Sequence, residues 1–439
     1  MTYLAAQLPL DNREITEKPG KIYLLPFIML FMSSMVVYKI GTTSRSATAL
    51  AYEQDPSRMI FLGITYLLAL LLFVNRLGKG IQFFLNNKIY LSLLSYVLFS
   101  AYWSGFPAKV FINWGHYAGL SLVLFSAAFY FSGRPERFFW VAALTLGIVI
   151  AASIPISIYL PKIGIDLNSG RWQGITGNPN SLGVLCIISI WANASCLYLS
   201  NNRLIRCASA IMALISAIAL WKTGSMTSKA VTFFILTSVS FLISIGKGSP
   251  TVKIMKIVAA IWLAFFLIGV FILLYPEIFT TEGAFSSIGR NATITGRNEV
   301  WAQGWKLSQI KPIFGWSFDS CMSAFRYINL HSTEFKFGQI HFGQFHSGYF
   351  DLLVRGGGIG LTLFFFILVR MFLMIKRGMK SNYRLVTIYA VMILAILLHN
   401  VTEASIMRET DMFWLIFVYI YFSLEYLFSK KRYTSAGDP

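Results

Sequence analysis

The segment Phe138–Leu160, FFWVAALTLGIVIAASIPISIYL, contains no charged residue and consists mainly of aliphatic and aromatic side chains. Its length lies within the roughly 17 to 25 residues that a helix needs to cross a bilayer. A second uncharged run, Ile257–Tyr275, lies further along the chain. Both runs indicate helices that span a membrane.

The composition extends this interpretation to the whole chain. Of the 439 residues, 56% are hydrophobic, 16% are aromatic and only 13% are charged, against about 25% charged residues in a typical globular protein. So few charges cannot cover a water-exposed surface. We therefore expect one polytopic membrane domain over residues 1–439, with an all-α fold.

Largely apolar stretches of sufficient length predict about twelve transmembrane helices. They cover roughly residues 22–40, 59–75, 89–103, 110–131, 138–160, 181–199, 204–221, 230–246, 254–275, 348–374, 385–402 and 412–428. Lys and Arg concentrate in the short loops on the side of the N-terminus, as at Lys376, Arg377 and Arg384. Because such loops resist translocation, we expect a cytoplasmic N-terminus.

The net charge raises the question of a nucleic-acid partner. The chain has 37 Lys and Arg against 18 Asp and Glu, a formal net charge of +19, and a large positive charge is typical of proteins that bind nucleic acid. Here the cations lie in short clusters between the apolar runs. We therefore expect membrane lipids as partners and no nucleic acid.

The connection over residues 276–347, between the ninth and tenth predicted spans, is much longer than the others. It is too polar to cross the membrane, and the charge count places it on the outer side. Within it, residues 295–310 predict an amphipathic helix with Thr295 as the N-cap. Trp301 and Trp305 are typical of the membrane–water interface.

Polar groups at the outer ends of the later spans are candidates for function, because such groups are costly near the bilayer. They are Arg171, Lys222, Lys229, Arg290, Arg297, His341, His346 and Glu403. Several cations with few carboxylates on one side indicate an anionic ligand, and Arg is well matched to phosphate oxygens. The alternative, that each cation contacts lipid headgroups or solvent, stays open.

Three local contexts sharpen this hypothesis. In residues 171–183, Asn180 or Ser181 is expected to cap a helix whose first amide groups face an anion. In residues 295–316, Arg297 precedes the Trp helix and the chain then returns to the membrane at Lys311-Pro312. In residues 346–360, His346 could take a proton from a sugar hydroxyl near neutral pH, although a structural histidine remains an alternative.

The sequence contains no motif for a metal or a nucleotide. It lacks H-E-x-x-H, paired-Cys and Asp-rich patterns, and its four cysteines have no metal-ligand spacing. No Walker or dinucleotide-binding loop is present. We therefore expect no metal and no cofactor.

The three contexts, in this order, resemble the O-antigen ligase and polymerase superfamily of bacterial envelope glycan transferases. The similarity covers residues 170–415. It rests on Gly174 with Asn178-Pro179-Asn180, Ser228-Lys229-Ala230, Gly296-Arg297 with Trp301, Pro312 with Gly315, and His346 with Gly356–Gly360. One departure is Lys229, where the family usually has Arg; lysine keeps the charge but loses the bidentate fork.

The resemblance implies a GT-C-like, metal-independent, inverting glycosyltransferase in the bacterial inner membrane, with its long loop and active site facing the periplasm. It implies a polyprenyl (undecaprenyl) diphosphate-linked glycan as the donor. Arg297 and Lys229 would grip the diphosphate, with Arg171 or Arg290 able to replace Lys229, and His346 would activate the acceptor hydroxyl. Glu403 would orient His346 or act itself.

The leading hypothesis is an O-antigen ligase that transfers a finished glycan to lipid A-core. A polymerase that extends O-antigen or exopolysaccharide repeats from the same donor is the alternative, since both share these motifs. A secondary transporter is a third hypothesis from another class; it predicts repeated halves and ionisable groups at mid-membrane. Few such groups are found, although Arg355 lies a few residues inside the tenth span.

Overall fold

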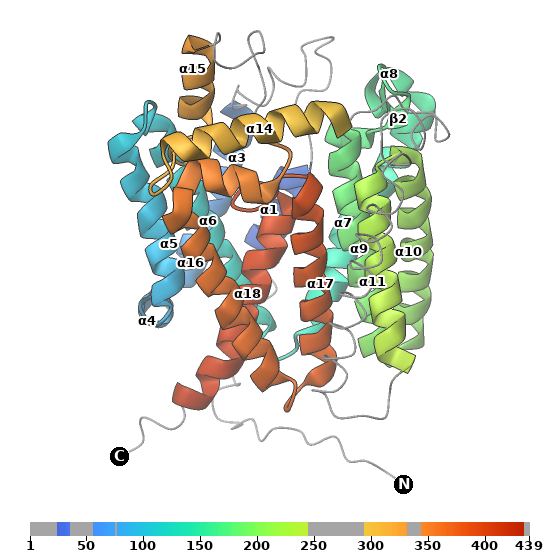
Figure 1. The fold of residues 1–439 in the computed structure, drawn as a ribbon. Helices are drawn as coiled ribbons and strands as arrows, with labels where there is room; N and C mark the ends of the chain where they lie inside the picture. Colours follow the sequence, from blue (N-terminus) through green and yellow to red (C-terminus); the bar gives the residue numbers. More distant parts are fainter. Residues whose placement is uncertain (1–23, 36–55, 75–76, 245–293, 332–343, 434–439) are drawn as a thin grey trace, which may run out of the picture.

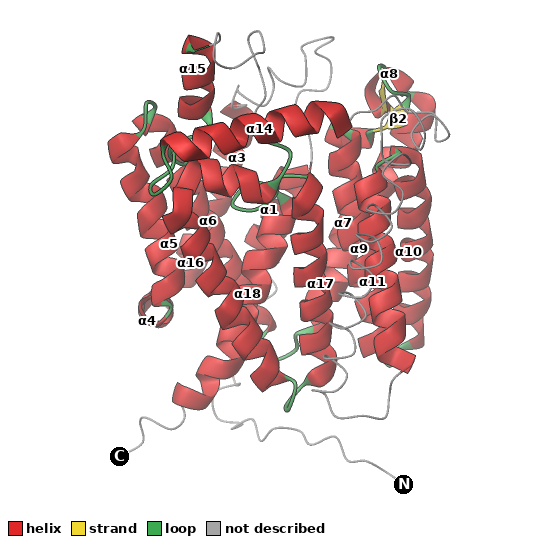
Figure 2. Ribbon diagram, in the orientation of Figure 1, coloured by secondary structure: helices red, strands yellow, loops and turns green. Residues whose placement is uncertain are grey.

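The computed structural model describes residues 24–35, 56–74, 77–244, 294–331 and 344–433 (Figure 1). Within these ranges the chain forms a bundle of helices, and a short antiparallel hairpin pairs Ile165 with Trp172 and Asp166 with Arg171. Helix dominates and the hairpin is small (Figure 2). We call the end that carries α8, α14 and α15 in Figure 1 the upper end, and the opposite end the lower end.

The described elements follow one another along the chain. In order they are α1 (Leu25–Met35), α3 (Pro56–Phe73), α4 (Leu77–Asn86), α5 (Lys88–Phe99), the 3-10 helix η3 (Ser100–Trp103), α6 (Pro107–Phe131), α7 (Glu136–Tyr159), α8 (Pro161–Gly164), β1 (Ile165–Asp166), β2 (Arg171–Trp172), η4 (Gly174–Thr176), α9 (Pro179–Leu199), α10 (Arg203–Thr223), α11 (Met226–Ser244), α14 (Ile294–Ile310), α15 (Met322–Leu330), α16 (Gly348–Gly378), α17 (Tyr383–Thr402) and α18 (Met412–Tyr433).

Every predicted span that falls on described residues coincides with a helix. In this part of the chain six helices are long and apolar enough to cross a membrane, namely α6, α7, α9, α10, α16 and α17. Arg58–Phe73 and Met412–Leu427 are shorter apolar helices. An all-α, multi-pass membrane protein is therefore confirmed. The predicted span 254–275 lies outside the described residues, so the number twelve and the GT-C assignment stay predictions.

Helix α18 lies at the centre of the bundle. It contacts α1, α6, α9, α16 and α17, and its side chains from Phe413 to Leu424 are almost all buried. Aromatic rings fill much of the space around it; the ring of Tyr419, for example, stacks on Phe138 with 3.7 Å between the ring centres. A central helix that is apolar on every face is the pattern of a buried membrane helix.

Asparagine caps and one glycine define the ends of α9 and α10. The side chain of Asn178 accepts hydrogen bonds from the amides of Asn180 (2.8 Å) and Ser181 (3.3 Å), and Pro179 follows it at the first helical position. The prediction that Asn180 or Ser181 caps this helix is therefore wrong. Because Asn178 occupies these amides, they are not bare groups that could face an anion. At the far end of α10, Gly224 has a φ of +62°, which turns the chain into α11.

Helix α16 is interrupted at Gly357, and the preceding loop occupies the interruption. Gly357 has a φ of +57° and a ψ of −159°, a conformation open essentially to glycine alone. The amides of Trp316 and Ser317 donate to the carbonyls of Val354 (2.8 Å) and Arg355 (3.0 Å). In return the amide of Gly358 donates to Pro312 O at 2.8 Å. Irregular backbone at membrane depth is tolerated where neighbouring protein satisfies it, as here.

A helix is present over the predicted residues as α14, which runs across the upper end (Figure 1). Thr295 lies within the helix, so its assignment as the N-cap is wrong. Val300 and Leu307 are buried against Phe345 and Val354. Trp301 stacks on Phe350, with 5.9 Å between the ring centres. The buried face of α14 thus packs on the start of α16.

Candidate functional site

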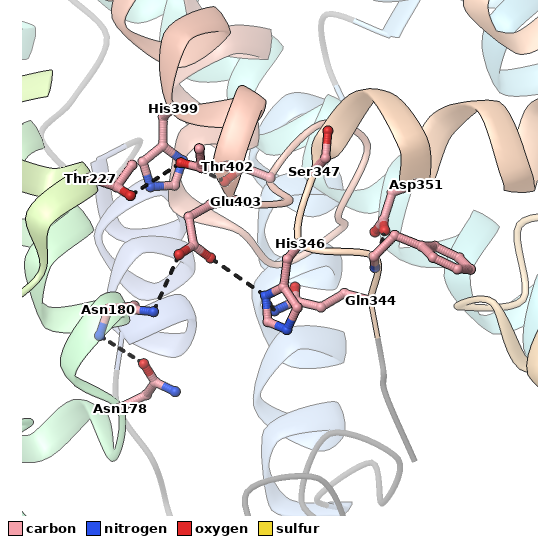
Figure 3. Close-up of polar contacts among 12 residues, drawn as sticks. Asn178, Asn180, Thr227, Gln344, His346, Ser347, Asp351, His399, Thr402 and Glu403 are labelled. Carbon is pink, nitrogen blue, oxygen red and sulfur yellow. Dashed lines mark hydrogen bonds and ion pairs between the residues drawn. The ribbon is translucent and has the colours of Figure 1, made fainter. Parts of the chain in front are cut away.

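Three segments distant in the sequence meet at the upper end. They are residues 344–347 before α16, the end of α17 and the start of α9 (Figure 3). His346 and Glu403 come together there, with His346 Nδ1 at 4.0 Å from Glu403 Oε2. The side chain of His346 is 32% exposed and that of Glu403 is 12% exposed. The imidazole is therefore accessible, whereas the carboxylate behind it is largely enclosed.

The same carboxylate is linked to a cation through an amide. Asn180 Nδ2 donates to Glu403 Oε1 at 3.4 Å, and Asn180 Oδ1 accepts from Arg171 Nη2 at 2.7 Å. Arg171 is held in turn because its Nε donates to Thr223 O at 2.6 Å. Arg171, Asn180, Glu403 and His346 thus form one line of polar contacts.

The backbone around His346 is fixed on both sides. Its φ of +51° is unusual for a residue other than glycine. The amide of the preceding Phe345 donates to Asp351 Oδ1 at 2.7 Å, and the amide of the following Gly348 donates to Glu403 O at 3.0 Å. Gln344 Nε2 lies 3.3 Å from His346 Nδ1. These contacts orient the imidazole toward Glu403.

Asn400 orders the chain that follows α17. Its Oδ1 accepts from the amides of Ser405 (2.8 Å) and Ile406 (2.9 Å). A Cβ on Gly348 would lie only 2.0 Å from this oxygen. Glycine at position 348 therefore permits the close approach of α16 to the end of α17, and this approach brings His346 beside Glu403.

An ion pair with one fully buried partner lies beside the site. Asp351 is fully buried, and its carboxylate binds Arg408 with an Nη2–Oδ2 distance of 2.5 Å. Burial acts to lower the pKa of Arg408, but the charge and hydrogen bond of Asp351, together with the nearby Cys321 and Glu409, outweigh burial and hold that pKa above its ordinary value. Arg355, also buried, donates to Met407 O (2.9 Å) and Ile406 O (3.1 Å). Both arginines tie α16 to residues 406–408.

The structure places the predicted site residues in different surroundings. It brings His346, Glu403 and Arg171 together. Lys229 lies on the first turn of α11 with its ammonium 4.3 Å from the centre of the Trp221 ring. Thr227, two residues earlier, bonds Thr402 beside Glu403 at 3.1 Å, and two residues rotate a helix by about 200°. Lys229 therefore extends from α11 on the side away from Thr402.

Two of the remaining predicted cations lie wholly or partly outside the described residues. Arg297 lies near the start of α14, and its side chain is outside the described part of the chain, as is the whole of Arg290. Lys222 lies 5.9 Å from the centre of the Trp172 ring, beside the hairpin that carries Arg171. His341 is also outside the described residues.

Sequence reasoning missed the uncharged members of the site. Asn180 was expected to act as a cap, and Gln344 and Asn400 were not singled out. One signal for Asn180 was available: a cap followed by proline at the first helical position is the common pattern, and Asn178-Pro179 fits it. This assignment leaves the side chain of Asn180 free for another partner.

The arrangement joins an accessible imidazole, an enclosed carboxylate and a guanidinium. A carboxylate beside the ring stabilises the imidazolium that forms when the ring takes a proton. A guanidinium at the same end suits an anionic substrate. Among the described residues no group of three or more His, Cys, Asp or Glu could hold a metal ion.

Part of the chain, including His346, is similar to a known protein family. Residues 188–365 match a family described as O-antigen ligase. The match runs from α9 into α16 and includes His346, whereas Arg171 and Glu403 lie outside it. A search of curated proteins found no match. This match over residues 188–365 confirms the resemblance to the O-antigen ligase and polymerase superfamily.

Proposed function

We propose that the protein is an O-antigen ligase that moves a glycan from a polyprenyl (undecaprenyl) diphosphate carrier onto lipid A-core. The reaction takes place at the periplasmic face of the bacterial inner membrane, without a metal or a cofactor, and inverts the anomeric centre. The observation that carries the proposal is the contact of His346 with Glu403 at the upper end of a membrane bundle that matches the O-antigen ligase family over residues 188–365.

His346 is the general base of this mechanism. The acceptor hydroxyl oxygen attacks the anomeric carbon from the face opposite the diphosphate, and its proton passes to the imidazole of His346. The new carbon–oxygen bond forms as the bond to the phosphate oxygen breaks, and its electron pair leaves with the lipid diphosphate. Glu403, beside Nδ1, stabilises the positive imidazolium. A positioned base of this kind accelerates a reaction by about 10² to 10⁴.

The cations bind the departing diphosphate in this proposal. Arg171, Lys229, Arg290 and Arg297 are the candidates, because preorganised positive charge in a partly dry site stabilises a leaving group that needs no proton. Arg171 has the strongest support, since Asn180 links it to Glu403. Residues 1–439 act as one membrane domain, and the loop 276–347 contributes to acceptor choice from the periplasmic side.

The polymerase alternative uses the same donor and the same residues. It differs in the acceptor, which is another lipid-linked glycan in place of lipid A-core. Because the family match covers ligase- and polymerase-type activity alike, the two are separated by supplying each acceptor in turn to the purified protein and measuring the glycan product.

The test of the proposal is glycan transfer by purified variants from a polyprenyl diphosphate-linked donor. His346→Ala should reduce transfer at least about 100-fold, and Arg297→Ala and Glu403→Gln should also reduce it. His331→Ala is the matched control, because His331 lies at the end of α15 and stacks on Tyr327. Full transfer by both His346→Ala and Arg297→Ala would exclude the proposed enzyme.

A further inference from the structure

We infer that Asn180 is a positioning residue that holds the Glu403 carboxylate against His346 and ties it to Arg171. The inference rests on the proposed function, because it assigns Asn180 a part in the same transfer. Asn180 lies at the start of α9 and Glu403 at the end of α17, and their side chains meet although 223 residues separate them in the sequence.

The orientation of the Asn180 amide follows from its neighbours. A guanidinium has only donors and a carboxylate only acceptors. The amide oxygen must therefore face Arg171 Nη2, at 2.7 Å, and the amide nitrogen must face Glu403 Oε1, at 3.4 Å. The two charges leave the amide one orientation. Asn180 thus presents a fixed donor to the carboxylate.

The helix does not need this side chain. Asn178 accepts from the amides of residues 180 and 181 and so caps α9. The described hydrogen bonds of the Asn180 side chain go to Arg171 and Glu403, which belong to other elements. A role in holding these two residues explains the side chain, whereas a role in the helix end does not.

A donor to Glu403 affects the chemistry through the charge of that carboxylate. Hydrogen bonding to the ionised form favours ionisation, and an ionised Glu403 supports the imidazolium of His346. The charged or titratable groups that face Glu403 through described contacts are His346 before α16 and, beyond Asn180, Arg171 from the hairpin. On α17 itself His399 packs on Phe413, and on α11 Lys229 covers Trp221.

The experiment measures kcat and KM for the polyprenyl diphosphate-linked donor across pH 4 to 9, in the full-length protein. The variants are Asn180→Ala and the nearly isosteric Asn180→Asp, which replaces the donor by a second carboxylate. Both should lower kcat by about tenfold or more and move the acid limb of the pH profile to higher pH, Asn180→Asp the further. The KM for the donor should change less than kcat.

Two neighbours serve as controls. Ser181→Ala removes an exposed side chain from the same turn of α9 and should leave the profile unchanged. Asn178→Ala removes the cap and should lower thermal stability without moving the acid limb. In a Glu403→Gln background, Asn180→Ala should add much less than its full loss of kcat, because most of its effect passes through Glu403 and only the remainder through Arg171.

Several results would overturn the inference. They are a wild-type pH profile in both Asn180 variants, a lower kcat with an unmoved acid limb, an additional full loss in the Glu403→Gln background, or unfolding of both Asn180 variants while Asn178→Ala folds. The last would assign Asn180 a structural role. The proposed function fails by a different result, undiminished transfer by His346→Ala and Arg297→Ala, so the two failures are distinguishable.

Discussion

Three charged residues, two near the start of α16 and one after α17, hold the backbone at the upper end in place. Asp351 and Arg355 lie inside a membrane helix, where an unpaired charge would be costly. Asp351 binds Arg408, and Arg355 donates to the carbonyls of residues 406 and 407. Asp351 also accepts from the amide of Phe345, next to His346. These charges hold the chain on both sides of the site in place.

The Asp351–Arg408 pair makes a prediction about stability. Arg408→Ala leaves the buried Asp351 carboxylate without this cation. Removal of one partner of a fully buried pair costs about 3 to 5 kcal/mol, and because the Arg408 side chain is 28% exposed we expect a loss below that range. We expect a clearly lower unfolding temperature in detergent. The double variant Asp351→Asn with Arg408→Ala should recover part of the loss. An unchanged unfolding temperature in Arg408→Ala would contradict the importance of the pair.

At the residue scale, the charged residues of the site could be predicted from the sequence, whereas its uncharged polar residues could not. His346, Glu403 and Arg171 stood out in the sequence because ionisable groups at the ends of apolar spans are rare. Asn180 and Asn400 carry no charge, and Asn180 finds its partner 223 residues away. A single sequence gives no information on such a pairing. Arg355, considered as a possible mid-membrane group of a transporter, instead binds the backbone of residues 406 and 407.

At the scale of elements, the structure explains why glycine occupies one position in α16 and one in the loop that packs against it. A Cβ on Gly357 would lie 2.4 Å from Ile313 O, and one on Gly315 would lie 2.5 Å from Arg355 O. Both residues also have a positive φ. These glycines therefore permit the close approach of the loop 312–317 to α16. The apolar runs predicted the helices, but the interruption of α16 depends on this loop and could not be read from one segment.

Substitutions at two neighbouring glycines of α16 should differ strongly in their effect on the free energy of unfolding. Gly357→Ala places a methyl group into backbone and strains the dihedral angles, so we expect a loss of at least about 3 kcal/mol in unfolding free energy or a failure to fold. Gly358→Ala, one residue away, meets Pro312 O at an ordinary 3.4 Å and should be tolerated. Thermal unfolding of the two purified variants measures the difference. Equal stability would contradict the close packing of the loop against α16.

At the scale of the whole molecule, the candidate site lies at one end of the helix bundle and the basic turn between α16 and α17 lies at the other. Residues 376–384, which hold Lys376, Arg377 and Arg384, connect α16 to α17 at the lower end (Figure 1). His346 and Glu403 lie at the upper end. Basic loops remain in the cytoplasm, so this polarity supports a periplasmic site.

Cysteine labelling tests this orientation. Cys186, Cys196 and Cys321 are buried and Cys207 is exposed, so Cys207→Ser gives a background with few reactive thiols. In that background Asn168→Cys, in the exposed turn of the hairpin, should react with an impermeant maleimide added from the periplasmic side. Ser381→Cys, in the turn after α16, should react only after the inner membrane is opened. The reverse pattern would place the site in the cytoplasm.

The hydrogen bonds between the loop 312–317 and α16 also impose an order on assembly during synthesis. Trp316 and Ser317 emerge from the ribosome before Val354 and Arg355, whose carbonyls they need. These hydrogen bonds can form only after the first part of α16 has been translated. Glu403 and Arg408 are translated later still, so the end of the molecule that bears His346 is among the last parts to mature.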